Sequence, residues 1–203
     1  TGYGSATRSA DIRPGEDVAI FGIGGVGMGA LQGAVNAGAR NIFAVDPVEW
    51  KRDQALKFGA THVYPDVFSA MGGIAEVTAG GMARKTIITT GELKGEDIDN
   101  YLNCTSKGGT CVVTAVANMA EMDVKLNLAL LTLMQKRLQG TIFGGGNPHY
   151  DIPQLLSMYK AGKLNLDDMV TRQYKLEQIN DGYQDMLQGR NIRGIIRYTD
   201  ADR

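Results

Sequence analysis

A glycine-rich turn between two apolar segments constrains this chain more than any other feature. The stretch "VAIFGIGGVGMGALQGAV" starts with an apolar run at 18 to 21, passes Gly22, Gly24 and Gly27, and enters a helix-like segment. A G-x-G-x-x-G pattern alone is weak in a chain with 27 glycines, but between a strand and a helix it is typical of dinucleotide binding. There the glycines permit a tight turn, a close approach of backbone to pyrophosphate, and close helix packing. The turn therefore predicts a strand, a phosphate-binding loop and a helix in that order.

The rest of the chain repeats this alternation. Short, apolar, largely β-branched runs are typical of strands buried on both faces. Six occur, at 18 to 21, 41 to 45, 62 to 64, 85 to 89, 110 to 116 and 138 to 143. Between them lie helical stretches such as 96 to 106, where apolar residues recur on one face. We therefore expect an α/β fold, a doubly wound six-stranded parallel sheet (Rossmann fold) in the order 3-2-1-4-5-6.

After residue 143 the pattern changes. Apolar positions predict two amphipathic helices, which end at Gly162 and Gly189. The run "GIIRY" at 194 to 198 predicts one last strand.

Asp46 indicates which cofactor the turn binds. It ends the second strand, 24 positions after Gly22, where a carboxylate accepts hydrogen bonds from both ribose hydroxyls of an adenosine. A 2′-phosphate would meet this carboxylate as like charge, so NAD is favoured over NADP unless Lys51 and Arg52 compensate. FAD or S-adenosylmethionine binding, or a glycine turn beside a surface aspartate, are less favoured interpretations.

Composition excludes several classes of partner. With 21 Lys+Arg against 22 Asp+Glu, the chain has neither a basic surface for nucleic acid nor a polybasic membrane anchor. Apolar runs such as "LNLALLTLM" at 126 to 134 fall short of the roughly 18 residues of a membrane span. Cys104 and Cys111 are the only cysteines, and their spacing suggests no disulfide, which favours a reducing cytosol. We expect a cytoplasmic protein.

Longer stretches carry a resemblance to a known family. The run from "TGYGSA" through "GIGGVGMGALQGAVNAGARNIFAVDPVEWKRDQALKFGATH" resembles the cofactor half of the zinc-dependent medium-chain alcohol dehydrogenases, as does the tail "GRNIRGIIRY". The stretches "VDPVEWKRDQALKFGATH", "LTLMQKRLQGTIFG" and "GRNIRG" most resemble the NDMA-dependent, nicotinoprotein branch. The resemblance implies hydride transfer between an alcohol or aldehyde and NAD(H), with zinc polarising the alcohol oxygen in the intact enzyme. It also implies an NAD-binding domain at 1–143 and a segment, 144–203, that returns to a catalytic domain.

The resemblance places the zinc outside this chain. In the family a zinc-ligating Cys stands just before the Thr-Gly-Tyr-Gly stretch, and the other ligands lie earlier, so all would precede Thr1. His62, His149 and the two cysteines show none of the close spacings of a zinc site. We expect no metal site and no catalytic residue here, zinc only in a preceding catalytic domain, and no activity of the chain alone.

The resemblance also implies individual cofactor contacts. Val26 matches the residue behind the nicotinamide ring, and Arg193 matches an arginine that binds the pyrophosphate, for which a guanidinium is apt. Lys51 matches a residue at the adenosine ribose, although a solvated helix lysine is an equal alternative. Four further positions match backbone contacts around the carboxamide. The predicted cofactor-binding residues are Gly22, Ile23, Gly24, Gly25, Val26, Gly27, Asp46, Lys51, Thr114, Val116, Thr141, Phe143 and Arg193. The stretch "GGGNPHYD" at 144 to 151 departs from the family pattern, because it lacks a lysine that many relatives carry there for a phosphate contact.

The predicted sixth strand bears on assembly. It lies at a sheet edge, a flat apolar edge recruits a partner, and relatives of the family pair there. We expect a homodimer or larger through 138 to 143, and a "GIIRY" strand that is mobile or paired with another chain. Two alternatives stay open: a free-standing nucleotide-binding or regulatory module, and a zinc-independent quinone reductase-like oxidoreductase. A cysteine codon a few positions before Thr1 in the gene would separate them from the zinc enzyme.

Overall fold

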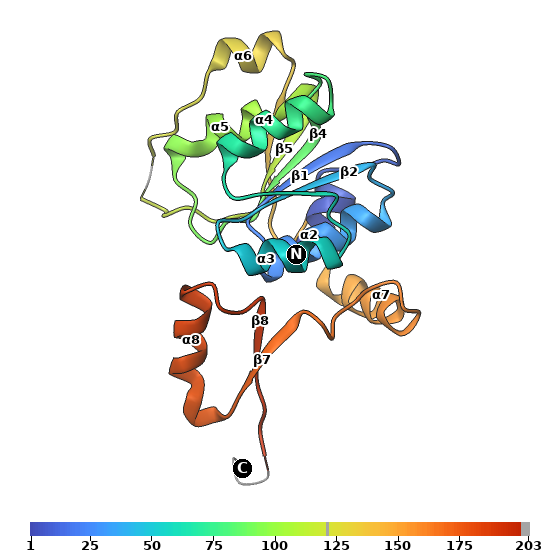
Figure 1. The fold of residues 1–203 in the computed structure, drawn as a ribbon, viewed down its shortest axis with the longest axis vertical. Helices are drawn as coiled ribbons and strands as arrows, with labels where there is room; N and C mark the ends of the chain where they lie inside the picture. The colour runs from blue at the N-terminus through green and yellow to red at the C-terminus, as the bar shows by residue number, and fades with distance from the viewer. Residues whose placement is uncertain (121, 200–203) are drawn as a thin grey trace.

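The fold is built around a six-stranded parallel sheet in the order β3-β2-β1-β4-β5-β6, as the sequence predicts (Figure 1). The computed structural model describes residues 1–120 and 122–199. The strands of the sheet are β1 (Asp17–Phe21), β2 (Asn41–Val45), β3 (His62–Tyr64), β4 (Ala83–Ile88), β5 (Thr105–Val113) and β6 (Arg137–Gly140).

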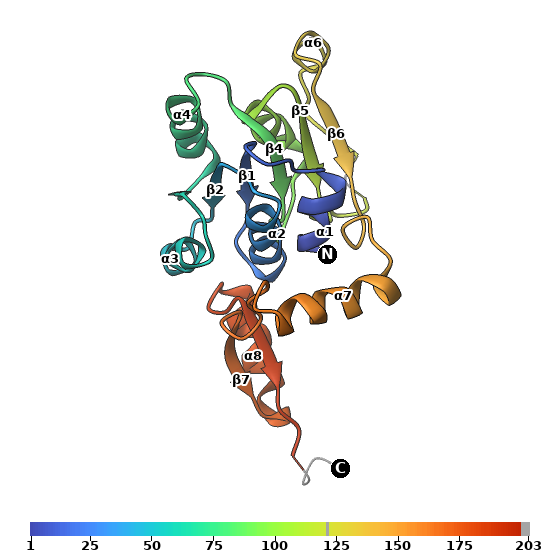
Figure 2. The same ribbon diagram turned by 90° about the vertical axis from the view of Figure 1, so that its right-hand side faces the viewer.

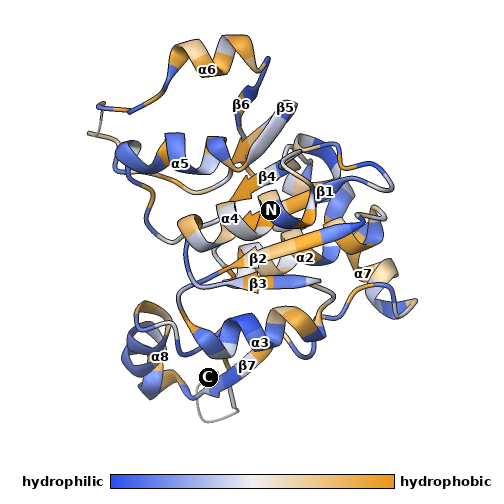
Figure 3. Cartoon of the chain, turned by 45° about the horizontal axis from the view of Figure 1, so that its top comes forward, coloured by the Kyte–Doolittle hydropathy of each residue, from blue (hydrophilic) through white to orange (hydrophobic). Residues whose placement is uncertain are grey.

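Helices cover both faces of this sheet, because side chains alternate between the two faces along each strand. Val18 and Ile20 pack in one cluster with α2 (Gly25–Asn36) and α3 (Glu49–Lys57). On the other face Phe21 packs in a cluster with α4 (Val67–Val77) and against Tyr101 of α5 (Ile98–Asn103). The hydrophobic colouring of the central strands in Figure 3 follows from this burial on both sides.

Several boundaries differ from the sequence prediction. The expected helix at 96 to 106 is a short 3-10 turn, η2 (Gly95–Asp97), followed by α5, and Thr105 already belongs to β5. β5 ends at Val113 rather than at 116, because the next two amides, of Thr114 and Ala115, both donate to the carbonyl of Ile88 and turn the chain away. The predicted strand at 138 to 143 ends at Gly140. It does form the edge of the sheet, reached through the short helix α6 (Leu128–Leu133).

The first residues form helical turns that the sequence did not predict. A single turn, α1 (Gly2–Gly4), continues into a five-residue π-helix, η1 (Ser5–Ser9). Both lie beside α2, as Figure 2 shows for α1. The packing is close, since a Cβ added at Gly33 would lie 2.9 Å from the carbonyl oxygen of Tyr3.

The C-terminal segment forms a small unit beside the sheet (Figure 1). It consists of α7 (Pro148–Lys160), β7 (Val170–Tyr174), a 3-10 turn η3 (Leu176–Gln178), α8 (Ile179–Leu187) and β8 (Arg193–Ile196). β8 pairs in parallel with β7. The predicted last strand is thus present, at Arg193–Ile196, but the expectation that it lacks a partner within the chain is wrong. The missed partner is "VTRQY", whose polar residues hide it from a search for apolar runs.

Gln32 of α2 ties this unit to the sheet. Its side-chain nitrogen donates to the carbonyl of Asn165 at 3.0 Å, and its side-chain oxygen accepts from the amide of Asn165 at 2.7 Å. Gln32 is buried, so both halves of its amide are satisfied by one residue of the loop between α7 and β7.

Asp185 of α8 ties the small unit together internally. Its carboxylate accepts a hydrogen bond from the Tyr174 hydroxyl at 2.8 Å and forms ion pairs with Arg172 and Arg190 at 3.3 and 3.5 Å. The Tyr174 hydrogen bond and the two cations lower the pKa of Asp185 below its ordinary value of 3.8, although burial opposes the shift. Ionised Asp185 therefore joins α8 to β7 and to the loop that leads into β8.

We predict that this unit loosens in acid. Because the pKa of Asp185 is lower in the folded state, its ionised form stabilises the fold above the ordinary pKa, and this contribution is lost as the pH falls through the folded value. Hydrogen exchange of the β8 amides should accelerate as the pH falls below about 4, beyond the intrinsic pH trend. Asp185→Asn should exchange faster at neutral pH and lose most of the acid dependence. An unchanged acid dependence in this variant would contradict the assignment.

Candidate cofactor site

The predicted phosphate-binding loop lies at the carboxyl edge of the sheet. β1 is flanked by β2 and β4, and the clusters that cover the sheet on its two faces include α2 on one side and α4 on the other. In an open parallel sheet such a reversal of strand order leaves a crevice in which ligands bind. The loop lines this crevice, because β1 ends at Phe21 and α2 begins at Gly25.

The three fingerprint glycines meet different steric requirements. Gly22 has a φ of +91°, and a Cβ there would lie 2.8 Å from the backbone nitrogen of Thr90. At Gly27 a Cβ would lie 1.8 Å from the carbonyl oxygen of Gly22, so only glycine lets α2 approach β1 this closely. At Gly24 a Cβ would meet no heavy atom within 4 Å. The space at Gly24 is therefore open toward a ligand.

Positive charge gathers at the start of α2. Gly24 is the N-cap of this helix and no side chain caps its first turn, so the first N–H groups and the positive end of the helix dipole face the crevice. Arg193 of β8 reaches the same turn, since a Cβ at Gly25 would lie 2.1 Å from its Nε atom. A helix N-terminus with an adjacent guanidinium is suited to binding a pyrophosphate.

Asp46 is held at the end of β2 with acceptor positions to spare. It is 6% exposed. Its Oδ2 atom accepts from the amide of Ile23 at 2.7 Å, and its Oδ1 atom accepts from the amide of Val48 at 2.9 Å. A carboxylate oxygen can accept two hydrogen bonds. The carboxylate thus fixes the glycine loop and still has a lone pair on each oxygen for a ligand hydroxyl.

Both basic residues that follow Asp46, Lys51 and Arg52, lie against other parts of the protein. Lys51 is 9% exposed, so the interpretation as a freely solvated lysine is wrong. A Cβ at Gly189 would lie 3.4 Å from its Nζ atom, and the neighbouring Trp50 donates to the carbonyl of Gly189 at 3.1 Å. The Arg52 guanidinium donates to the carbonyl of Asp46 at 2.8 Å.

The predicted carboxamide contacts lie in two loops at the same edge of the sheet. Thr114 and Val116 follow β5, and Thr141 and Phe143 follow β6. The amides of the two threonines donate to Ile88 and Val113 across the strand ends, at 3.0 Å each. Val116 is 81% exposed and Phe143 is 62% exposed, so little core packing fixes the outer parts of these loops. Val26 lies in the first turn of α2, where its carbonyl would be 1.9 Å from a Cβ at Gly2.

Sequence reasoning missed Thr90. Its Oγ1 atom is buried and has no hydrogen-bond partner, and it is the one side-chain polar atom of this kind among the described residues. It borders the crevice beside Gly22, whose carbonyl already accepts from the Thr89 hydroxyl at 2.6 Å. A buried hydroxyl without a partner costs free energy, which a ligand would recover. The signal in the sequence was a polar pair, Thr89 and Thr90, directly after an apolar strand.

These features together fit a dinucleotide. The groups that gather around the glycine loop are the spare acceptors of Asp46, the Arg193 guanidinium and the unpartnered Thr90 hydroxyl, and the loop has open space at Gly24.

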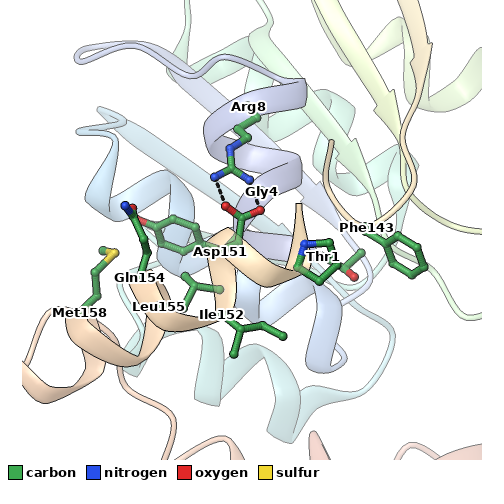
Figure 4. Close-up of a pocket in the computed structure, with 11 residues that line it drawn as sticks. Thr1, Gly4, Arg8, Phe143, Asp151, Ile152, Gln154, Leu155 and Met158 are labelled. Atoms are coloured by element: carbon green, nitrogen blue, oxygen red, sulfur yellow. Dashed lines mark hydrogen bonds and ion pairs between the residues drawn. The ribbon is translucent and has the colours of Figure 1, made fainter. Parts of the chain in front are cut away.

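A groove of about 270 Å³ lies between the first residues of the chain and α7 (Figure 4). Phe143 joins this groove to the loop after β6, and Ile152, Leu155 and Met158 of α7 line it with apolar surface. Its charged members, Arg8 and Asp151, are paired with each other. The groove therefore suits an apolar group rather than an ion.

Two kinds of site were not found within the described residues. No group of three His, Cys, Asp or Glu side chains there is placed to hold a metal ion. Nor does any helix of the described ranges combine the length and apolar character that crossing a bilayer requires.

Known proteins are similar to this chain in sequence and in fold. A family model for zinc-binding dehydrogenases matches residues 25–161. The chain is 75% identical over 203 residues to alcohol dehydrogenase B of Mycobacterium tuberculosis, and 44% identical over 199 residues to the NDMA-dependent alcohol dehydrogenase of Amycolatopsis methanolica. These matches cover 100% and 98% of this chain but only 54% of the length of each relative.

Solved structures agree. The benzyl alcohol dehydrogenase of Acinetobacter calcoaceticus matches with a TM-score of 0.89 at 28% identity, over 98% of this chain and 54% of that one. A zinc-binding domain alcohol dehydrogenase of Burkholderia ambifaria matches with a TM-score of 0.88 at 32% identity, over 98% and 53%. The chain thus spans about half the length of the proteins it matches. By its sequence and its glycine-loop fold, this chain belongs to the zinc-binding dehydrogenase family.

Proposed function

We propose that this chain is the NAD(H)-binding half of a zinc-dependent alcohol dehydrogenase. The observation that carries the proposal is the crevice at the start of α2. There Asp46, a carboxylate suited to binding ribose hydroxyls, and Arg193, a cation suited to binding phosphate, lie on either side of an open glycine turn. The relatives named alcohol dehydrogenase support the reaction class, an alcohol or aldehyde as the small-molecule substrate.

Each part of the crevice has a role in this proposal. Asp46 accepts the adenosine ribose hydroxyls and excludes a 2′-phosphate by charge, which favours NAD(H) over NADP(H). The first turn of α2 and Arg193 bind the pyrophosphate. The loops after β5 and β6, with Val26, orient the nicotinamide ring, which when bound supplies the hydride chemistry.

The remainder of the enzyme lies outside this chain in the proposal. Residues 1–143 form the cofactor domain, and 144–203 return to a catalytic domain that holds the zinc. Zinc there would act as a Lewis acid on the alcohol oxygen. We also propose the nicotinoprotein, NDMA-dependent type and a cytoplasmic location, the latter in keeping with two free, buried cysteines.

The edge of the sheet supports a dimer. All four residues of β6 are exposed, and the preceding helix α6 exposes Leu128 (66%) and Leu133 (71%). Figure 3 shows the largely hydrophobic colouring of α6. An unpaired parallel edge beside exposed leucines is a surface that a second copy can extend. We propose a homodimer or larger through β6 and the residues up to 143.

Two glycine variants should separate stability from binding. Gly24→Ala places its methyl group in open space, so the variant should unfold at the parental temperature while NADH binds at least tenfold more weakly, since the methyl group occupies pyrophosphate space. Gly27→Ala meets the Gly22 carbonyl and should be destabilised. Thermal unfolding and NADH titration measure both. Parental NADH affinity in Gly24→Ala would count against the phosphate assignment.

A second test concerns Asp46. Charge-assisted hydrogen bonds contribute about 1.5–3 kcal/mol each, so Asp46→Asn should weaken NADH binding about tenfold or more and narrow the preference over NADPH. The matched control is Asp17→Asn, a buried carboxylate bound to Arg40 at the opposite end of β1. It should lower stability without changing cofactor preference. Equal affinity of the parent for NADH and NADPH would overturn the assignment.

A third test separates binding from turnover. The chain should bind NAD(H) but oxidise no primary alcohol, even with added zinc, because the described residues offer no cluster of three zinc ligands. A longer protein that includes the residues before Thr1 should oxidise alcohols. Activity of the 203-residue chain itself would show that the chemistry lies in this half.

A further inference from the structure

The π-helix η1 lies across the ends of β5 and β6 and holds both through serine hydroxyls. The Thr114 hydroxyl donates to the Ser5 hydroxyl at 3.0 Å, and the hydroxyls of Ser9 and Thr141 lie 2.7 Å apart. Ser5 is fully buried. One short helical segment thus contacts the first residue of each loop beyond its strand.

Close backbone contacts fix η1 itself. A Cβ at Gly2 would lie 1.9 Å from the Val26 carbonyl, and one at Gly4 would lie 2.5 Å from the Gly144 carbonyl. The preceding turn is therefore wedged between the start of α2 and the loop after β6. The Ser5 hydroxyl also donates to the carbonyl of Thr1 at 3.1 Å, which limits its rotation. η1 is a rigid element from which loops can be positioned.

The two loops depend on these bonds more than the rest of the site does. Their outer apolar residues, Val116 and Phe143, are largely exposed, so core packing fixes these two side chains less than it fixes the strands. On the adenosine side Asp46 makes two backbone hydrogen bonds of its own, to Ile23 and Val48, that do not involve η1. η1 also packs against α2, but among the described residues the serine hydroxyls bond only to the loops after β5 and β6 and to the carbonyl of Thr1, so their removal leaves the hydrogen bonds of Asp46 in place.

We propose that Ser5 and Ser9 are positioning residues that set the loops after β5 and β6 for the nicotinamide half of the cofactor, while leaving the adenosine half unaffected. This inference rests on the proposed function, since it assumes that NAD(H) lies in the crevice. A π-helical turn at this place agrees with the frequent occurrence of such turns at functional sites.

ADP-ribose is the probe that separates the two halves, because it carries the adenosine and pyrophosphate but lacks nicotinamide. Calorimetric titration of NADH and ADP-ribose would compare the parent with Ser5→Ala and Ser9→Ala. Loss of one hydrogen bond corresponds to about a three- to tenfold weaker affinity for NADH, with ADP-ribose affinity unchanged. Ser9→Thr keeps the hydroxyl and should restore NADH binding. Ser106→Ala, at the opposite end of β5, is the control for loss of a serine.

A double-mutant cycle tests the pair directly. Thr141→Val keeps the shape but removes the other hydroxyl, so Ser9→Ala combined with Thr141→Val should weaken NADH binding no more than either change alone. Fluorescence of bound NADH should shift in the same variants, since it reports the surroundings of the nicotinamide.

The outcomes are distinct. Equal weakening of NADH and ADP-ribose would show a merely structural role and overturn the inference, as would unchanged NADH affinity in both alanine variants. A parent that binds ADP-ribose but not NADH would also overturn it, while leaving the nucleotide site in place. A parent that binds neither molecule would overturn the proposed function and the inference with it.

Discussion

The close approach of α2 to the end of β1 decides where every part of the crevice lies. Gly27 sits so near the Gly22 carbonyl that a methyl group would overlap it. This contact lets the helix begin directly against the strand, so its uncapped first turn opens at the edge of the sheet. The Asp46 carboxylate then bonds the same loop at Ile23, which joins the end of β2 to the end of β1. A bulkier residue at Gly27 would move the helix dipole, the loop and the carboxylate together.

The site is completed from both ends of the chain. Arg193 reaches Gly25 only because the small C-terminal unit is fastened to α2 through Gln32 and to α3 through Trp50. At the other end the N-terminal turns lie on α2 and hold the loops after β5 and β6. The central sheet supplies the crevice, and the flanking segments supply charge and constrain the loops. The residue with the buried, unpartnered hydroxyl, Thr90, lies beside Gly22 of the glycine loop.

The two halves of the crevice differ in how they are built. The adenosine side consists of a glycine loop and a carboxylate within about 25 residues of each other in sequence, linked by backbone hydrogen bonds. The side proposed for nicotinamide consists of loops with exposed apolar residues, whose first residues hydrogen-bond through hydroxyl groups to η1, far away in sequence. The proposed function assigns these two halves different tasks: recognition of the constant adenosine group on one side, and orientation of the nicotinamide ring on the other.

The sequence by itself determined the sheet and its order, because strands buried on both faces must be apolar throughout and parallel strands require crossovers. It also determined the glycine loop and Asp46, since these depend on local spacing along the chain. Only the tertiary structure decided the rest. β7 is polar and half-exposed and forms only against β8, and β6 ends at Gly140 although the apolar run continues. The positions of Lys51 against Gly189, of Arg193 against Gly25 and of Ser9 against Thr141 join residues more than 100 positions apart. Such contacts leave no periodic signal in the sequence, because they depend on how packed elements meet rather than on the pattern within any one of them.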